Sequence, residues 1–267
     1  MKTNSTHELV KDSYADMLKG AQESSACCTS SPAARLAGYE EAEQHGEAAG
    51  ASFGCGNPLA FAGVRPGDTV LDLGSGAGLD LLIAAEKTGA SGRVIGIDMT
   101  DEMIEAARAN ASRAGCDNIE VRHGLIEDLP VEDASVDWVI SNCVINLAPE
   151  KAPVFAEIAR VLKPGGQFSI SDIVVDTLPD WIRESAAAWS ACVAGAISEQ
   201  DYLAGLRAAG LEDVKVVDRM VYDAGQLRAI LSEDIPGLDL DMSLIEDLLQ
   251  EHAGAVWSAK FTGHKPG

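Results

Sequence analysis

The sequence predicts an α/β fold in which a parallel sheet is covered by helices on both faces. From residue 67 onward, short apolar runs alternate with amphipathic segments, which is the order of strands and helices in such folds. A glycine-rich turn separates the first apolar run from the helix that follows it. The chain of 267 residues is long enough for one core domain with a smaller appendage.

The first sixty residues predict helix and loop. Leu9, Val10 and Tyr14 stand near helical spacing and favour a weakly amphipathic helix over residues 5–19. The stretch "AARLAGYEEAEQ" is a second helical candidate, and "HGEAAGASFGCGNP" holds four glycines and reads as a loop. We therefore expect residues 1–60 to form an N-terminal segment of helices and loops that contributes cysteines.

Residues 61–176 are expected to form the core. The predicted strands are "DTVLDLG", "GRVIGIDM", "NIEVRHG", "VDWVISNCVI" and "QFSISDIVV", and the helices between them are "LDLLIAAEKTG", "TDEMIEAARANASRAG" and "PEKAPVFAEIARVLKPGG". The second helix has a clear beginning and end, because Thr100 can cap it and Gly115 can stop it. The third is expected to close at its Pro-Gly-Gly turn.

The C-terminal third is less regular and predicts a smaller α+β region over residues 177–267. We expect helices near residues 180–190 and 199–209, then strands near 211–217 and 254–262. These strands are expected to complete the sheet.

Composition excludes several classes of partner. The chain has 42 Asp and Glu against 20 Lys and Arg, a formal net charge of −22, and such a surface repels nucleic acids and anionic membranes. No run approaches the roughly 18 uncharged apolar residues of a membrane span, and "MKTNSTHELVKDSY" is too polar for a signal peptide. We therefore place the protein in the cytoplasm and expect a monomer.

The glycine-rich turn predicts a cofactor site. In "VLDLGSGAGLD", Gly74, Ser75, Gly76 and Gly78 lie between a strand and a helix, where the backbone can approach a ligand closely. Asp98 ends the next strand, and an acidic residue there can bind both hydroxyls of a ribose. Dinucleotide folds share these features, but their glycines follow the pattern GxGxxG.

Here the glycines follow the pattern GxGxG, and the preceding Asp72 would suit the ammonium group of a methionine moiety. Together with "HGLIEDLP" and "LKPGG", this region resembles the Rossmann-like class I S-adenosylmethionine-dependent methyltransferases. The resemblance implies that Met99 packs on the adenine and that Glu127, with Ile126 beside it, lies near the adenine amino group. It also implies that Asn142 lies near the sulfonium.

Six cysteines occur, at positions 27, 28, 55, 116, 143 and 192, and none forms a CxxC pair. Cys143 directly follows Asn142, and in this class of fold that strand end faces the transferable methyl group. Cys55 and Cys192 lie in segments that can roof the same cleft. Three thiols from three separate elements suit a soft, thiophilic centre such as trivalent arsenic.

Four stretches resemble the arsenite S-adenosylmethionine methyltransferases over nearly the whole chain: "GCGNPLAFAGVRPGDTVLDLGSGAG", "GIDMTDEMIEAARANA", "SVDWVISNCVINL" and "CVAGAIS". The resemblance implies that Cys55, Cys143 and Cys192 bind As(III). It places the family's N-terminal cysteine on Cys28, with Cys27 as a rival, and gives Cys116 no role. A disulfide between Cys28 and Cys55 would supply electrons, and a thioredoxin or glutathione-type thiol would reset it.

The implied reaction belongs to arsenic detoxification. Thiolates replace the ligands of a trivalent arsenical, which would arrive as a thiol adduct, and the arsenic lone pair attacks the methyl carbon of S-adenosylmethionine. No general base and no permanent metal are needed, so the site mainly holds the reacting atoms in line.

Two rival functions remain open on the sequence. A small-molecule C-methyltransferase would keep the glycine loop but would not need scattered thiols. A protein that sequesters As(III) would need the thiols but not the loop. The sequence also leaves open how many methyl groups are added and which reductant acts. It does not show which of arsenite, methylarsenite and antimonite is preferred. Asp80 is expected to favour the positive end of a helix, and His45 and His123 are expected to be ordinary polar residues.

Overall fold

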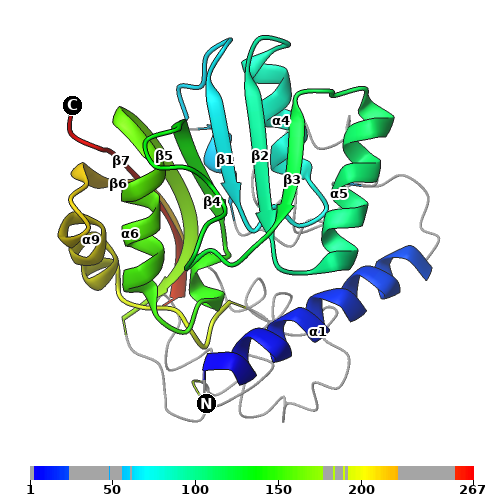
Figure 1. Ribbon diagram of the computed structural model, residues 1–267. Helices are drawn as coiled ribbons and strands as arrows, with labels where there is room; N and C mark the ends of the chain where they lie inside the picture. Colours follow the sequence, from blue (N-terminus) through cyan, green and yellow to red (C-terminus); the bar gives the residue numbers. More distant parts are fainter. Residues whose placement is uncertain are drawn as a thin grey trace.

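The computed structural model describes residues 3–23, 48, 56–60, 62–176, 183, 189, 192–221 and 256–267. The strands within this part of the chain form one sheet in the order β3-β2-β1-β4-β5-β7-β6 (Figure 1). Their bounds are β1 Thr69–Leu73, β2 Arg93–Asp98, β3 Ile119–His123, β4 Val136–Asn142, β5 Leu162–Val175, β6 Glu212–Val221 and β7 Val256–His264.

The sheet is parallel from β1 to β5, as the alternation of strands and helices predicts. The last two strands depart from that expectation, because β7 is antiparallel to both β5 and β6. The predicted parallel sheet is therefore mixed. The C-terminal region completes the same sheet, with β7 placed between strands that precede it in the chain.

Helices cover both faces of the sheet (Figure 1). One face carries α4 and α5, and the other carries α6 and α9. The bounds are α1 Thr3–Glu23, α4 Leu79–Thr88, α5 Asp101–Ala114, α6 Lys151–Val161 and α9 Glu199–Ala208, with short 3-10 helices η2 Pro58–Ala60 and η3 Ile145–Leu147. The helix predicted at 33–44 lies outside the described residues, as does that at 180–190 except for residues 183 and 189.

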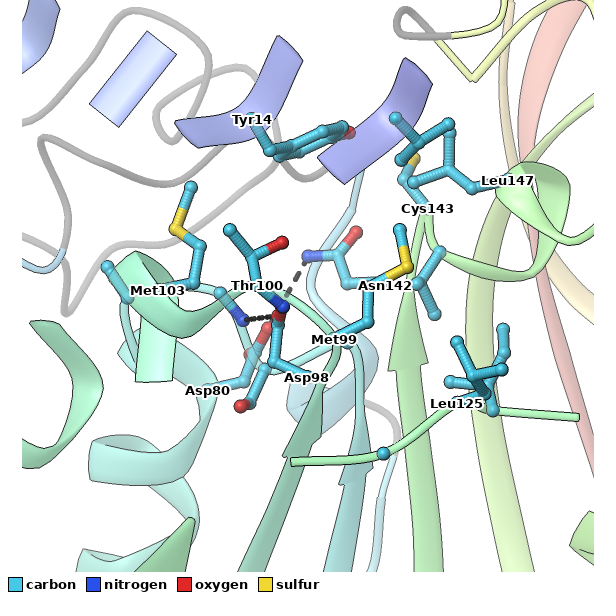
Figure 2. A pocket seen from close by; sticks show the side chains of 18 of the residues that line it. Tyr14, Asp80, Asp98, Met99, Thr100, Met103, Leu125, Asn142, Cys143 and Leu147 are labelled. Atoms are coloured by element: carbon cyan, nitrogen blue, oxygen red, sulfur yellow. Dashed lines mark hydrogen bonds between the residues drawn. The ribbon is translucent and has the colours of Figure 1, made fainter. Parts of the chain in front are cut away.

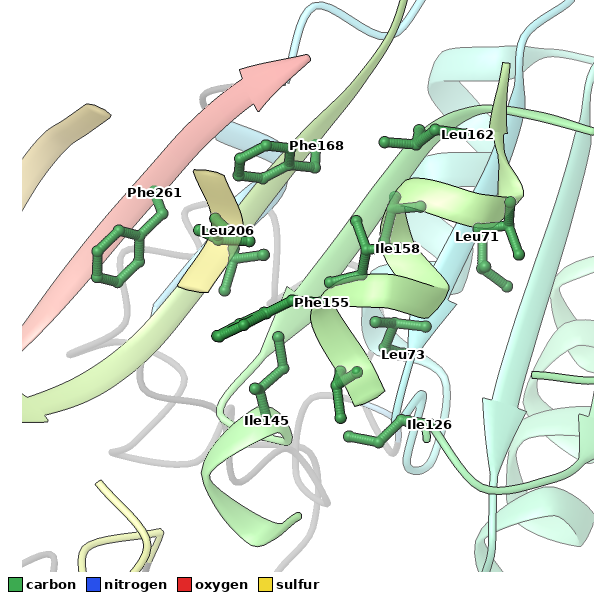
Figure 3. Packing of buried hydrophobic residues seen from close by; sticks show 14 of the residues in the cluster. Leu71, Leu73, Ile126, Ile145, Phe155, Ile158, Leu162, Phe168, Leu206 and Phe261 are labelled. Atoms are coloured by element: carbon green, nitrogen blue, oxygen red, sulfur yellow. The ribbon is translucent and has the colours of Figure 1, made fainter. Parts of the chain in front are cut away.

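Two apolar clusters pack on opposite faces of the sheet, because successive side chains of a strand point to opposite sides. Leu71 and Leu73 pack toward α6, against Phe155 and Ile158 (Figure 3). Val70, between them, belongs to the cluster under α4 and α5. The central strands are thus buried on both faces, which fixes their carboxyl ends in space.

The two ends of α5 test the local predictions. Gly115 follows α5 with φ 69°, the left-handed conformation that a glycine stop requires, so that prediction is confirmed. Thr100 occupies the position before α5, but its hydroxyl makes no capping bond. Its backbone N–H donates instead to Asp98 Oδ1 at 2.9 Å, so the predicted cap bond is wrong.

The Pro-Gly-Gly segment belongs to the strand after α6, although it was expected to end that helix. Helix α6 ends at Val161, and Lys163–Gly166 fall within β5 as an irregularity. Val136 pairs with Leu162, but Trp138 pairs with Gln167, so these residues are extra to the ladder. The turn therefore interrupts the strand and does not close the helix.

Helix α1 lies across the carboxyl ends of the parallel strands (Figure 1). Its closest helical neighbour is α5. Among the described helices, none has the length and apolar composition that a membrane crossing requires.

Candidate functional site

A pocket opens at the carboxyl ends of the parallel strands, beneath α1 (Figure 2). This is the edge where open α/β sheets bind ligands. It brings together ten of the residues that the sequence predicted: Gly74, Ser75, Gly76, Gly78, Asp98, Met99, Ile126, Glu127, Asn142 and Cys143. The residues that the prediction drew from β1, β2 and β4 therefore converge on one cavity.

The glycine loop can take this shape only because three of its residues are glycines. Gly74, Gly76 and Gly78 all have positive φ, at 66°, 50° and 92°. A Cβ on Gly74 would stand 2.4 Å from Cγ2 of Val144, whereas a Cβ on Gly76 would meet nothing within 4 Å. Gly74 thus permits close packing against the segment after β4, and Gly76 leaves the pocket floor open for a ligand.

Asp98 is held at the end of β2 by backbone N–H groups. Its Oδ2 accepts from Gly76 N and its Oδ1 from Thr100 N, both at 2.9 Å. Burial raises the pKa of this carboxyl, while the same N–H groups oppose the rise by stabilising the charged form. Asp98 also lines the pocket, and a carboxylate there can accept from a ligand's hydroxyls.

The two other carboxylates near the loop differ from expectation. Asp80 lines the pocket, whereas its place in the first turn of a helix predicts only a favourable interaction with the helix dipole. Asp72, predicted to bind cofactor, is 2% exposed and is not among the pocket-lining residues. Burial raises the pKa of Asp72 well above its usual value, and the charges of Asp80 and Asp98 raise it further.

Asn142 lines the pocket as predicted and also makes a contact that the sequence did not indicate. Its Nδ2 donates to Gly56 O at 2.6 Å, and its Oδ1 accepts from Gly56 N at 3.2 Å. This pair of bonds fixes the end of β4 to the residue that follows Cys55 in the chain. Asn142 Nδ2 also lies 3.5 Å from Asp80 Oδ2.

Cys143 and Cys192, 49 residues apart, are in contact. Cys192 Sγ donates to Cys143 O at 2.9 Å, and both residues have left-handed backbones, with φ of 60° and 58° respectively. Such values are uncommon for residues with a Cβ and often mark functional sites. Cys143 is disulfide-bonded, whereas Cys192 carries a free thiol.

Among the described cysteines, Cys143 lines the pocket, whereas Cys192 and Cys116 are not among its lining residues. Cys27, Cys28 and Cys55 lie outside the described residues, so their predicted roles stay predictions. Cys116 lies just after α5, partly exposed, with Sγ 3.9 Å from Ala114 O. It is not among the residues that line the pocket.

Cys192 lies near two charged side chains, those of Asp172 and Lys151. Burial, followed by the charge of Asp172, raises the pKa of the Cys192 thiol to about 12. Burial also raises the pKa of Asp172 to about 7. The Lys151 ammonium and the Tyr202 hydroxyl oppose this rise, and the hydroxyl donates to Asp172 Oδ2 at 3.1 Å. The pKa of Lys151 falls to about 8, again chiefly through burial. The sequence reasoning missed this group.

Helix α1 supplies residues that the sequence reasoning also missed. His7 Nε2 lies 2.8 Å from Glu127 Oε1, and Lys11 Nζ donates to Asp101 Oδ2 at 3.3 Å. Tyr14 lines the pocket. The spacing of positions 7, 11 and 14 places them on one helix face, which is the only sequence signal that could have indicated a shared role.

Comparison with known proteins agrees with this geometry. Residues 65–217 match the family described as "Methyltransferase domain". The structure is similar to the crystal structure of an arsenic(III) S-adenosylmethionine methyltransferase from Chlamydomonas reinhardtii, with a TM-score of 0.64 and 32% identity, covering 88% of this chain and 74% of that one. The chain belongs to the arsenite methyltransferase family. Its Rossmann-like class I methyltransferase fold is the one that the sequence predicted.

Two curated arsenite methyltransferases are also similar in sequence. That of Halobacterium salinarum is 43% identical over 231 residues, covering 80% of this chain and 59% of the relative. That of Aquipseudomonas alcaligenes is 38% identical over 222 residues, covering 79% and 64%. The chain thus spans about three fifths of the length of the curated relatives that it matches.

Proposed function

We propose that this protein transfers the methyl group of S-adenosylmethionine to trivalent arsenic held by cysteine thiolates, as part of arsenic detoxification. The observation that carries the proposal is the hydrogen bond from the Cys192 thiol to the backbone of Cys143, a residue that lines a pocket built from a glycine loop and a strand-end carboxylate. A methyl-donor pocket alone would not require a second cysteine beside Cys143. A thiol site alone would not require the glycine loop.

The pocket fits S-adenosylmethionine, which supplies an electrophilic methyl group on a positively charged sulfur. Asp98 would accept from the ribose hydroxyls, and Met99 would pack on the adenine near Glu127. The open space over Gly76 leaves room for the ligand at the loop. Asp80 is the carboxylate placed to bind the ammonium group, since it lines the pocket and Asp72 does not.

The arsenic side of the site would use Cys143 and Cys192, with Cys55 as the third thiol. Gly56, the neighbour of Cys55, is hydrogen-bonded to Asn142, which adjoins Cys143. Because the pKa of Cys192 is about 12, this thiol would lose its proton only as arsenic binds. Cys143 must be reduced before it can bind arsenic, which is a role for a thioredoxin or glutathione-type thiol.

The first test is the identification of arsenic species after the purified protein is incubated with S-adenosylmethionine, arsenite and a thiol reductant. We expect methylated arsenic from the wild type and loss of at least a hundredfold in activity for Cys143→Ser and Cys192→Ser. Cys116→Ser is the matched control and should retain full activity, because Cys116 lies away from the pocket. Equal activity in all variants would refute the thiol site.

The other outcomes separate the rival functions. Stoichiometric arsenite binding without any methylated product, at saturating methyl donor and reductant, would indicate a sequestering protein. Binding of S-adenosylmethionine without any binding of arsenite would indicate a methyltransferase for another small molecule.

A further inference from the structure

We infer that Tyr14 is a positioning residue for the arsenic site, whose hydroxyl stabilises the Cys192 sulfur once that sulfur has lost its proton. Helix α1 therefore contributes to arsenic binding as well as covering the pocket. This inference rests on the proposed role of Cys192 as an arsenic ligand.

The geometry places the Tyr14 hydroxyl beside the thiol. Tyr14 Oη lies 3.7 Å from Cys192 Sγ, within hydrogen-bonding range for sulfur, across 178 residues of sequence. Figure 2 shows the Tyr14 ring over the pocket, with its hydroxyl end directed toward the side where Cys143 and Leu147 lie. Val10, one helical turn earlier, packs in the same apolar cluster as Cys143 and Cys192.

The chemistry of arsenic binding changes what Cys192 needs from its neighbours. As a thiol, Cys192 donates its proton to Cys143 O. When the sulfur–arsenic bond forms, a carrier ligand leaves the arsenic and takes that proton, departing as a neutral thiol, or as water when the carrier ligand is hydroxide. No electrons are exchanged in this step.

After the sulfur–arsenic bond has formed, the Cys192 sulfur has no proton left to donate and can only accept hydrogen bonds, and the carbonyl of Cys143 no longer receives one. Cys192 is 3% exposed, so water does not replace the lost bond. The Tyr14 hydroxyl is the donor that the described residues place within range of the sulfur. Lys151 also carries positive charge nearby, but its ammonium donates to Asn146 O and Ala148 O.

Helix α1 is held in the position that this role requires. His7 pairs with Glu127 at the pocket wall, and Lys11 pairs with Asp101 at the start of α5. Both contacts come from the helix face that carries Tyr14. The His7–Glu127 pair carries most of this anchoring, because the side chains of Lys11 and Asp101 are 39% and 69% exposed and such exposed pairs contribute little.

The test is the affinity of the reduced full-length protein for arsenite, measured by equilibrium dialysis with elemental detection and without S-adenosylmethionine. Tyr14→Phe removes only the hydroxyl and should weaken arsenite binding about tenfold, because it leaves a buried acceptor without its donor. Its affinity for S-adenosylmethionine should stay within twofold, since the ring is retained. Lys11→Met, on the same helix face but without a sulfur contact, should bind arsenite like the wild type.

A double-mutant cycle with Cys192→Ala completes the experiment. In the Cys192→Ala background, Tyr14→Phe should have no further effect on arsenite affinity. An equal effect in both backgrounds would overturn the inference, as would wild-type affinity of Tyr14→Phe or an equal loss in Lys11→Met. If Cys192→Ala itself binds arsenite like the wild type, the proposed thiol site fails, whatever Tyr14 does.

Discussion

Asp72 and Asp80 are both buried carboxylates beside the glycine loop, but only one lines the pocket. We expect Asp80→Asn to weaken S-adenosylmethionine binding at least tenfold, because it removes the charge that would face the ligand's ammonium group. Asp72→Asn should change that affinity less than threefold, because it mimics the protonated form that burial favours. Isothermal titration calorimetry measures both, and the opposite ranking would restore Asp72 as the ammonium partner.

Gly74 and Gly165 provide a matched pair of glycines with positive φ, at 66° and 78°. An alanine at either position adopts a left-handed backbone, which costs about 1–2 kcal/mol. Only at Gly74 does the new methyl group collide with a neighbour, Val144, and such overpacking adds about 1–3 kcal/mol. Gly74→Ala should therefore lower the free energy of unfolding clearly more than Gly165→Ala, as measured by denaturant unfolding. Equal losses would mean that Val144 yields to the methyl group.

Cys116 and Cys192 are free thiols in contrasting surroundings. Cys116 is partly exposed, whereas Cys192 is buried and has a pKa of about 12. Since the thiolate is the reactive form, we expect iodoacetamide at pH 8 to alkylate Cys116 at least tenfold faster in the native protein. Peptide mass spectrometry resolves the two sites, and comparable rates would show that the segment carrying Cys192 opens readily.

At this scale, the predictable residues are those at a fixed offset from a strand end. Gly74 follows β1, Asp98 ends β2 and Cys143 follows β4. Once these strands are predicted from the sequence, the place of each residue at the edge of the sheet follows. Asp80 lies in the first turn of α4. The sequence does not show whether a side chain in that turn faces the pocket or points away from it. Tyr14 meets Cys192 across 178 residues, and no local pattern encodes such a contact.

At the scale of elements, the docking of α1 depends on two ion pairs of unequal burial. The side chains of His7 and Glu127 are 20% and 16% exposed, whereas those of Lys11 and Asp101 are 39% and 69% exposed. Exposed pairs contribute little, typically about 0–1 kcal/mol. The structure thus assigns most of the polar docking of α1 to His7.

We therefore expect His7→Ala to increase amide hydrogen exchange throughout α1 several-fold, while Lys11→Met changes it less than twofold. Hydrogen exchange with mass spectrometry measures this directly, with the amides of α5 as an internal reference. Faster exchange in both variants to the same degree would mean that the two pairs contribute equally.

The elements themselves were largely predictable, because buried parallel strands and amphipathic helices have distinct patterns. Helices α4 and α5 and strands β1 to β3 match their predicted ranges to within about two residues. The Pro-Gly-Gly segment did not follow its local signal, because its residues lie as an irregularity between paired parts of β4 and β5. The pairing of β4 with β5 on both sides of this segment outweighs its local preference for a turn that would end the helix.

At the scale of the whole molecule, buried carboxyls control how stability changes with pH. The folded pKa of Asp172 is about 7, against about 3.9 in an unfolded chain. The folded state thus binds the proton more tightly, so this contribution to stability is fully present below about pH 4 and is lost as the pH rises toward 7. The raised pKa of Asp72 acts in the same direction.

Asp172→Asn should therefore flatten the decline in unfolding free energy between pH 5 and 7, by up to about 1.4 kcal/mol per pH unit. The amide keeps an oxygen that can accept from Tyr202. Lys151 is the charged partner across this site, and its lowered pKa of about 8 acts only above that pH. Urea unfolding across the range measures the slope, and parallel curves for the two proteins would show that Asp172 does not titrate there.

The order of the sheet was the least predictable feature of the molecule. The patterns at 211–217 and 254–262 indicate strands, but they do not say which edge the strands join or in what order. In the structure β7 pairs with β5 through Gln167 to Val175 and with β6 on its other side. Such choices depend on contacts between segments far apart in the chain, which no window of sequence contains.

The place of β7 has a consequence for synthesis on the ribosome. Because β7 lies between β5 and β6, neither of those strands can complete its pairing until residues 256–264 have left the exit tunnel. Until then the nascent chain presents β5 as an open apolar edge, and open edges invite pairing with other chains. A ribosome that stalls between β6 and β7 would therefore release a product prone to aggregation, despite holding every residue of the cofactor pocket.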